Sequence, residues 1–176
     1  MKLNTVVLNE MNKQLSRIEA CINLLSEAQI WYKLKPTMNS IGNLCLHLAG
    51  NEYQHFVSGI GNLPFQRTRS REFLENNGMN GRDLLQLLHD VRRQSSGILE
   101  GLKETDLQKS VTIHYSIEDW NKMLVRSTLE TEAHYSKDIE IMLVQVCEHY
   151  SYHTGQIVLL TKWISESQNS ITGTFH

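Results

Sequence analysis

Apolar residues recur at steps of three and four along four long stretches of this 176-residue chain. That spacing places them on one face of an α-helix, and each stretch keeps it for several turns. Polar residues suited to cap a helix stand before three of the stretches. We therefore expect long helices at 3–25, from Asn39 or Ser40 to near Gly59, at 80–102, and from near Ser136 or Asp138 to Ile164.

Two connections between these stretches are long. We expect 59–80 to be an irregular loop, because glycine, asparagine and proline are frequent in it. In the other connection, 103–135, the segments 111–115 and 123–125 have strand composition and flank a polar turn. A small hairpin between the third and fourth helices is therefore expected.

The chain has only two prolines, Pro36 and Pro64, and its length suits one domain, 1–176. The expected fold class is all-α, a four-helix bundle with long connections. Seventeen Lys and Arg against nineteen Asp and Glu give a formal net charge of −2, so there is no overall attraction for nucleic acid. No apolar run approaches the ~18 residues of a membrane span, and the first residues do not resemble a signal peptide. Three widely spaced cysteines argue against a disulfide framework, and we expect a cytoplasmic protein without nucleic-acid or membrane partners.

Two histidines, His149 and His153, interrupt the apolar stripe of the expected fourth helix. Residues four apart on a helix are neighbours, so the two imidazoles can converge on one metal ion at ~2.1 Å each. A metal would satisfy ring nitrogens that burial otherwise leaves without partners. The alternative is a pair of core histidines bonded to tyrosine hydroxyls and backbone, and the fourth helix alone does not decide between the two.

His47 is the best candidate for a third metal ligand, because it lies mid-helix among apolar and small residues. Cys45 and Cys147 each precede a candidate histidine by two positions, which turns their side chains ~200° away on a helix. Neither cysteine can share a metal with its neighbour. A His-Glu-x-x-His signature is absent, so that kind of built-in general base is missing.

Side chains that hydrogen-bond to the other ring nitrogen of each histidine should orient the imidazoles. The candidates for this role are Asn51, Tyr152 and Gln156. Ordinary polar contacts are the alternative for each. Glu52 and His55 spell Glu-x-x-His, but a di-iron bundle needs two such motifs and the chain has one. The remaining histidines stand in polar surroundings and are expected to be exposed: His89, His114, His134 and His176.

Every second residue from 67 to 71 is an arginine: Arg67, Arg69 and Arg71. In an extended segment all three side chains would point the same way. They could then grip the carboxylates of a small thiol cofactor, although a solvated loop is the simpler interpretation.

Two motifs resemble a known family. The run from Pro36 to Glu52 is similar to the second helix of the DinB-like (YfiT-like) superfamily, and 148–157, Glu-His-Tyr-Ser-Tyr-His-Thr-Gly-Gln-Ile, to its C-terminal His-x-x-x-His-x-Gly-Gln-Ile motif. Asn62-Leu63-Pro64-Phe65, with the three arginines, resembles a poorly characterised branch. The resemblance covers nearly the whole chain and is weakest over 103–135. At the metal-ligand positions the sequence keeps the histidines of the family motifs.

The resemblance implies one divalent metal, Zn, Ni, Fe or Mn, held by His47, His149 and His153. Some relatives are S-transferases that use bacillithiol, mycothiol or glutathione, and many are dimers. A site of three imidazoles leaves one coordination position for an outside ligand. The expected function is therefore a metal-dependent thiol S-transferase with a small-molecule substrate, in a homodimer. The alternatives are a metal-dependent hydrolase and a non-enzymatic metal-binding bundle.

Overall fold

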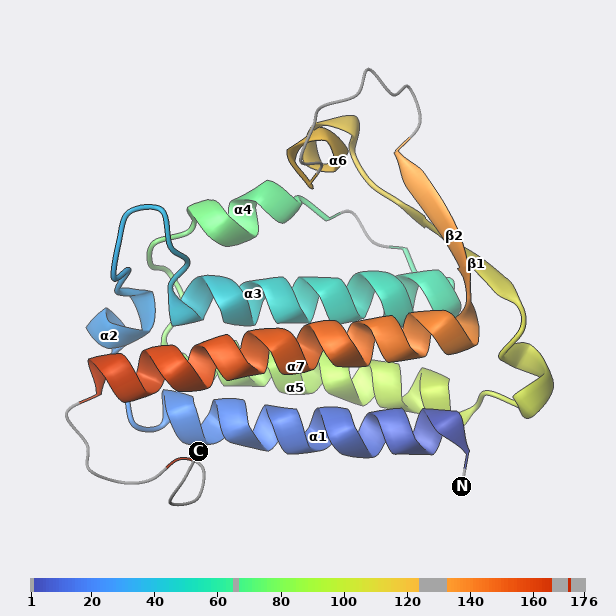
Figure 1. Cartoon of the computed structure of the whole chain (residues 1–176), viewed down its shortest axis with the longest axis horizontal. Helices are drawn as coiled ribbons and strands as arrows, with labels where there is room; N and C mark the ends of the chain where they lie inside the picture. The colour runs from blue at the N-terminus through green and yellow to red at the C-terminus, as the bar shows by residue number, and fades with distance from the viewer. Residues whose placement is uncertain (1, 65–66, 124–132, 166–170, 172–176) are drawn as a thin grey trace.

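Four long helices lie side by side and run along the length of the molecule (Figure 1). They are α1 (Leu3–Ile22), α3 (Ile41–Glu52), α5 (Gly81–Glu100) and α7 (Ile139–Ile164). The computed structural model describes residues 2–64, 67–123, 133–165 and 171. Within these residues the chain is mostly helical, which confirms the expected all-α class.

Local polar contacts explain where two of these helices begin. The Ser40 hydroxyl accepts from the Asn43 N–H at 3.1 Å, and Asn43 Oδ1 accepts from the Ser40 N–H at 3.0 Å, which closes a capping box at the start of α3. The Asn80 side chain caps α5 by accepting from the Asp83 N–H at 3.0 Å. Both starts agree with the sequence. The short helix α2 (Glu27–Trp31), which the sequence analysis did not predict, has its own capping box, formed by Ser26 and Gln29.

The apolar stripes of the four helices face one another and form the core. Their burial removes large aliphatic side chains from water, at about 25 cal/mol per Å² of apolar surface. The fully buried members come from every long helix and include Met11, Ile18, Leu44, Leu48, Leu84, Leu88, Met142 and Ile157.

The connection 59–80 is irregular in part, as expected, but it also contains a short helix. The helix begun by α3 continues as a π-helix, η1 (Tyr53–Ile60), and a short helix α4 (Arg69–Leu74) lies along α3 (Figure 1). The carboxylate of Asp119 accepts from the N–H groups of Arg69 and Ser70, both at 3.0 Å, and so caps α4. Because the cap stands about fifty positions further along the chain, no local sequence signal announces this helix.

The hairpin exists, but with a different partner strand. β1 (Ser110–His114) pairs antiparallel with β2 (His134–Asp138), and Ser110 stands opposite Asp138. Of the predicted second strand, Met123 ends the short helix α6 (Ile117–Met123), and 124–125 lie outside the described residues. A single 3₁₀ turn, η2 (Glu104–Asp106), precedes β1. Thr112 and Ser136, facing one another across the strands, share a hydroxyl hydrogen bond of 2.7 Å.

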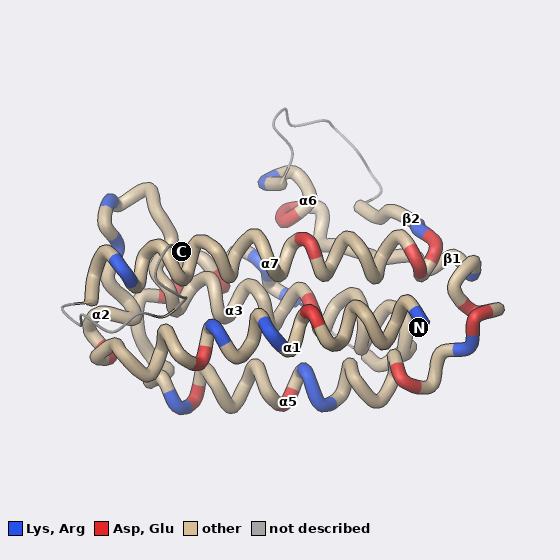
Figure 2. The backbone as a smooth tube through the Cα atoms, turned by 60° about the horizontal axis from the view of Figure 1, so that its bottom comes forward, with Lys and Arg blue, Asp and Glu red and all other residues tan. Residues whose placement is uncertain are grey.

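Basic and acidic residues alternate along the chain and do not gather on one side in Figure 2. This mixture agrees with the near-neutral net charge of −2. Among the described helices, none combines the length and the apolar character needed to cross a membrane.

Candidate metal centre

Three histidines from two helices meet between α3 and α7. His47 lies on α3, and His149 and His153 lie one turn apart on α7. The ring centroids are 4.6–5.0 Å apart in the three pairs, and one ring nitrogen from each histidine lies within 4.8 Å of the others. The shortest approach joins Nε2 of His47 and Nε2 of His149, at 3.0 Å. The structure thus brings together the three residues that the sequence singled out as metal ligands.

A buried carboxylate fixes the orientation of the His47 ring. Glu72 of α4 places Oε2 2.9 Å from His47 Nδ1, and Arg67 binds the same carboxylate through Nε at 2.6 Å and Nη2 at 2.7 Å. Arg67 Nη2 also lies 3.2 Å from His47 Nδ1 and 3.3 Å from the His47 carbonyl. Because a carboxylate paired with an arginine can only accept, we assign the proton to His47 Nδ1, which donates it to Glu72. Nε2 of His47 therefore directs a lone pair at the cluster.

A second contact orients His153. Its Nδ1–H donates to Gln156 Oε1 at 2.7 Å, and the Gln156 amide donates to the Tyr152 hydroxyl at 3.1 Å. Gln156 and Tyr152 thus lie where the sequence placed them. Asn51 instead contacts a histidine outside the cluster, because its backbone oxygen accepts from His55 Nδ1 at 2.7 Å. Among the described residues, Glu72 and His149 are the side-chain hydrogen-bond partners of the His47 ring.

The cluster is electrically neutral at neutral pH. Burial lowers the pKa of His47 to about 2, and the positive charge of Arg67 acts in the same direction. Burial also lowers the pKa of His149 to about 2, followed by the effect of His47. The pKa of His153 falls through burial, against the opposing hydrogen bond to Gln156. Neutral imidazole is the form that binds a metal ion.

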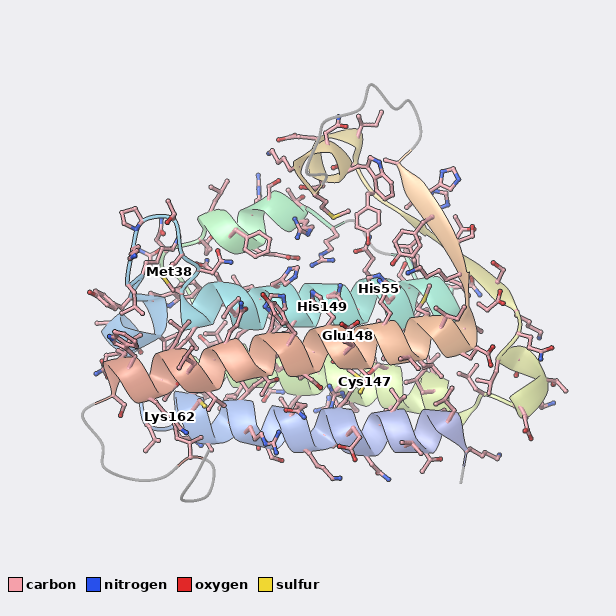
Figure 3. All side chains as sticks on the ribbon, viewed as in Figure 1. Met38, His55, Cys147, Glu148, His149 and Lys162 are labelled. Carbon is pink, nitrogen blue, oxygen red and sulfur yellow. The ribbon has the colours of Figure 1, made fainter. Side chains whose placement is uncertain are left out.

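The neighbouring cysteines are not part of the cluster. Cys45 is fully buried, and burial raises the pKa of its thiol to about 12. Figure 3 shows Cys147 on the side of α7 that faces α5, while His149 lies on the side that faces α3. The helical geometry that separates residues two positions apart accounts for both cases.

Glu52 is committed to a separate network in the core, so the Glu-x-x-His motif is not a metal motif. The guanidinium of Arg92 donates to both Glu52 oxygens, at 2.7 and 2.9 Å, and the Ser95 hydroxyl donates to one of them. His55 is buried and binds the Tyr135 hydroxyl at 2.6 Å through Nε2. The exposed positions expected for His89, His114 and His134 are observed, and His176 lies outside the described residues.

Two site residues escaped the sequence analysis in their actual roles. Glu72 was not singled out, because the segment around it was expected to be an irregular loop. The three arginines do not share one direction, because Arg69 and Arg71 lie on the helix α4 and not on an extended segment. Arg67 is buried against Glu72, whereas Arg71 is exposed. The nearest available signal was the Arg-x-x-x-x-Glu spacing of Arg67 and Glu72, which is common on protein surfaces.

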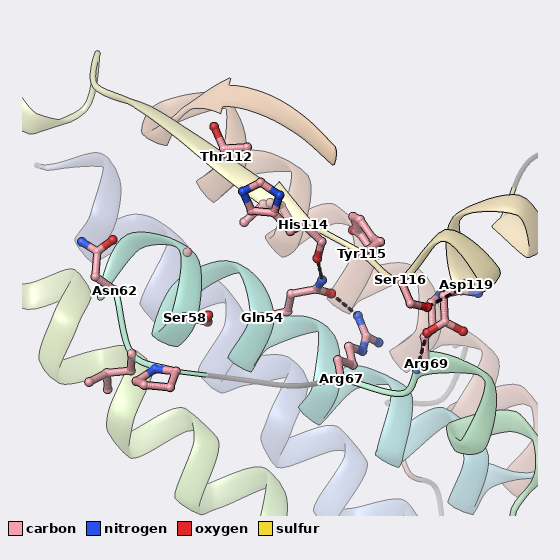
Figure 4. A pocket seen from close by; sticks show the side chains of 14 residues that line it. Gln54, Ser58, Asn62, Arg67, Arg69, Thr112, His114, Tyr115, Ser116 and Asp119 are labelled. Carbon is pink, nitrogen blue, oxygen red and sulfur yellow. Dashed lines mark hydrogen bonds between the residues drawn. The ribbon is translucent and has the colours of Figure 1, made fainter. Parts of the chain in front are cut away.

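A cavity of about 670 Å³ is lined in part by Arg67 and Arg69 (Figure 4). Residues of η1, of β1 and of the start of α4 line it, and polar groups predominate. Gln54 links two of its walls, because it accepts from Arg67 Nη1 at 2.7 Å and donates to the His114 carbonyl at 2.9 Å. The dashed lines in Figure 4 mark both bonds.

Two solved structures share this fold. A conserved protein from Enterococcus faecalis is 16% identical, with a TM-score of 0.65 over 93% of this chain and 98% of its own. A DinB-like protein from Bacillus cereus ATCC 10987 is 13% identical, with a TM-score of 0.65 over 96% of this chain and 95% of its own. At these identities the likeness concerns the fold, which is that of DinB-like proteins, as the sequence motifs predicted.

The family follows from the sequence. Residues 3–173 match the family described as "Protein of unknown function (DUF1572)", and the chain belongs to it. A comparison with curated proteins gave no match.

Proposed function

We propose that this protein is a divalent-metal-dependent enzyme that holds one ion with His47, His149 and His153. The observation that carries the proposal is the 3.0 Å separation of His47 Nε2 and His149 Nε2. His47 Nε2 has no proton, because the proton is on Nδ1 and faces Glu72. At this distance either His149 Nε2 donates its proton to His47 Nε2 or a cation lies between the two lone pairs, and the third imidazole, His153, favours the cation.

The shortest of the nitrogen–nitrogen distances, 3.0 Å, suits a metal ion. Two imidazole nitrogens that each bind one ion at ~2.0–2.1 Å lie roughly 3.0–3.4 Å apart, for angles between 90° and tetrahedral. The outer nitrogens of His47 and His153 donate to Glu72 and Gln156. A histidine ligand of a metal typically makes this kind of contact with its other nitrogen. Three neutral imidazoles suit zinc, nickel and iron, and manganese less well, so the donor set leaves the choice of metal open.

The reaction that we favour is transfer of a low-molecular-weight thiol, such as bacillithiol, to a small electrophile. A divalent ion with three protein ligands keeps a position for an outside ligand and lowers the pKa of a thiol that binds there. The chain supplies no thiolate of its own at this place, since burial raises the pKa of Cys45 and Cys147. The residues of the site would hold and orient: His47 through Glu72, and His153 through Gln156.

Hydrolysis is the second candidate. It requires a base that takes the proton of the attacking water. The carboxylate beside the cluster, Glu72, already accepts from Arg67 and from His47, and this leaves it poorly suited to that role. A non-enzymatic role in stability is the third candidate. The partial exposure of His149 and His153 favours a site that outside molecules can reach.

The test compares metal-loaded and chelated protein. Each is incubated with a model electrophile and with bacillithiol, mycothiol or glutathione, and the thioether product is measured. We expect turnover only with both the metal and a thiol. Equal rates in the two preparations, or product formed by water without any thiol, would contradict the transferase.

At the level of the whole protein, we propose a single domain, 1–176, built as a four-helix bundle, in a cytoplasmic homodimer. Several large apolar residues of α7 are exposed, which supports a dimer in which a second copy covers them. They are Ile141, Val144, Tyr152, Leu159 and Trp163. Exposed apolar residues on a monomer are usually scattered singly, whereas these follow one helix. Light scattering at high concentration should give the mass of a dimer, and a strictly monomeric species would contradict this part of the proposal.

A further inference from the structure

The cavity beside Arg67 has the size of a small-molecule site. The charged residues that line it differ in whether they have partners within the protein. The cavity volume, about 670 Å³, lies within the ~300–1,000 Å³ typical of ligand pockets. Two arginines and one carboxylate, Arg67, Arg69 and Asp119, are among its lining residues. The question is which of these charges the protein has already neutralised.

Arg67 and Asp119 bind other groups of the protein. The Arg67 guanidinium donates to Glu72, to Gln54 and to the His47 carbonyl. The two oxygens of Asp119 accept from the backbone N–H groups of Arg69 and Ser70, and one of them also accepts from the Ser70 hydroxyl at 2.5 Å. Four of the five guanidinium N–H groups of Arg67 and both oxygens of Asp119 thus already have partners within the protein.

Arg69 is different. Its guanidinium lies over the Phe73 ring, with 5.0 Å from Cζ to the ring centroid, and forms no ion pair within the described part of the chain. Burial lowers the pKa of Arg69 from its ordinary value, an effect too small to discharge an arginine. Glu72 and Asp119 act on this guanidinium only without a direct ion pair, so an anion from outside the chain can still bind to it.

Phe73 also places Arg69 near the histidines. Its ring centroid lies 4.8 Å from that of His47. The Arg69 guanidinium and the His47 ring therefore both contact Phe73 and lie within about 10 Å of each other. A small molecule about 10 Å long can therefore contact both the guanidinium and the histidines.

We propose that Arg69 binds a carboxylate of the substrate or thiol that reacts at the histidine centre, with the cavity beside Arg67 holding the rest of that molecule. The inference rests on the proposed function for the reacting end, and on the cavity alone for the carboxylate end. Hydroxyls of Ser58, Tyr115 and Ser116 line the cavity and can bind the polar body of such a molecule.

A carboxylate fits better than a phosphate. One guanidinium offers a fork of two parallel N–H donors, which matches one carboxylate in charge and in shape. Phosphate groups are commonly cradled by backbone N–H groups at a helix start, and here Asp119 already occupies those of Arg69 and Ser70.

The experiment measures binding of succinate to chelated, metal-free protein by calorimetry. Succinamide, which has the same shape without charge, is the ligand control. Arg69→Gln should weaken succinate binding by roughly tenfold to a hundredfold. Arg71→Gln removes an exposed arginine of the same helix and should bind succinate as the wild type does. Arg69→Lys keeps the charge without the fork and should lie between wild type and Arg69→Gln, so the test holds even if Arg69→Gln does not fold.

Three results would overturn the inference: no succinate binding to the wild type, equal affinity in the wild type and Arg69→Gln, or binding of inorganic phosphate in preference to succinate. Because the protein is metal-free in this assay, failure here concerns the cavity. A separate titration with zinc concerns the histidines, so loss of zinc binding with succinate binding retained would contradict the proposed function and leave the carboxylate site standing.

Discussion

Glu72 is the residue on which the geometry of the His47 ring depends most directly. Its carboxylate accepts the Nδ1 proton and thereby leaves Nε2 free to bind a metal. We predict that Glu72→Gln weakens zinc binding by about tenfold to a hundredfold, the usual effect of losing a partner that orients a histidine ligand. Competition with a chelating dye measures the affinity. Glu75→Gln, an exposed carboxylate just after α4, is the control, and equal affinities in the two variants would contradict the role of Glu72.

His55 should make stability depend on pH. Burial lowers its folded-state pKa to about 4, against an ordinary value of 6.5. As the pH falls below 6.5, the unfolded chain takes up a proton that the folded protein refuses, so stability is full above 6.5 and declines toward pH 4. At pH 5 the loss should be about 1–2 kcal/mol from this residue.

Urea unfolding at pH 7.5 and pH 5 measures this loss. The other buried histidines also contribute, so the informative quantity is the difference between wild type and His55→Gln, which should lose less stability between the two pH values. His114→Gln removes an exposed histidine of β1 and should keep the wild-type difference. An unchanged pH dependence in His55→Gln would show that His55 already titrates normally in the folded protein.

Individual site residues could be predicted from the sequence where side chains able to bind a metal stand at helical spacing within an apolar stripe. His149 and His153 stand out because two polar side chains interrupt an apolar stripe at helical spacing. Gln156 and Tyr152 follow from the same helix. Glu72 could not be found in this way, since its contact with His47 joins residues 25 positions apart through a helix without a local signal.

At the element scale, Gly50 determines how closely α4 approaches α3. A Cβ at Gly50 would lie against the Glu72 carboxylate and 2.9 Å from Arg67 Nε. We predict that Gly50→Ala displaces this pair and weakens zinc binding, although alanine alone would favour the helix by about 1 kcal/mol.

Gly97 is the matched control, because it lies in α5 with open space where its Cβ would be. Gly97→Ala should raise the free energy of unfolding by about 0.5–1 kcal/mol and leave zinc binding unchanged. If Gly50→Ala gained the same stability and bound zinc as the wild type does, the close contact between α3 and the Glu72–Arg67 pair would be unimportant.

The elements differ in how far the sequence could predict them. The starts of α3 and α5 carry their own caps, so Ser40 and Asn80 mark them correctly. The partner of β1 could not be chosen, because β2 has the unremarkable sequence His-Tyr-Ser-Lys-Asp, and its pairing depends on the chain returning after α6. Long-range pairing of this kind leaves little trace in local composition.

At the scale of the whole molecule, the arrangement of the long helices brings ligands from distant parts of the sequence to one place. His47 and His149 are 102 positions apart, and only the packing of α3 beside α7 makes them neighbours. The periodic stripes predicted that these helices pack through their apolar faces, and hence that polar residues on those faces meet. They did not specify which helix lies beside which, so His47 remained a candidate until the fold was known.

The central claim is that the three histidines hold one metal ion. Metal content of untagged, purified protein, measured by mass spectrometry together with protein concentration, tests it most directly. We predict one divalent ion per chain in the wild type, and the same in a His114→Ala, His134→Ala double variant, whose exposed rings lie opposite each other in the hairpin. His153→Ala should lose the ion while keeping its helical circular dichroism. An unchanged ratio in folded His153→Ala, or wild-type protein that takes up no divalent ion when it is supplied, would contradict the account.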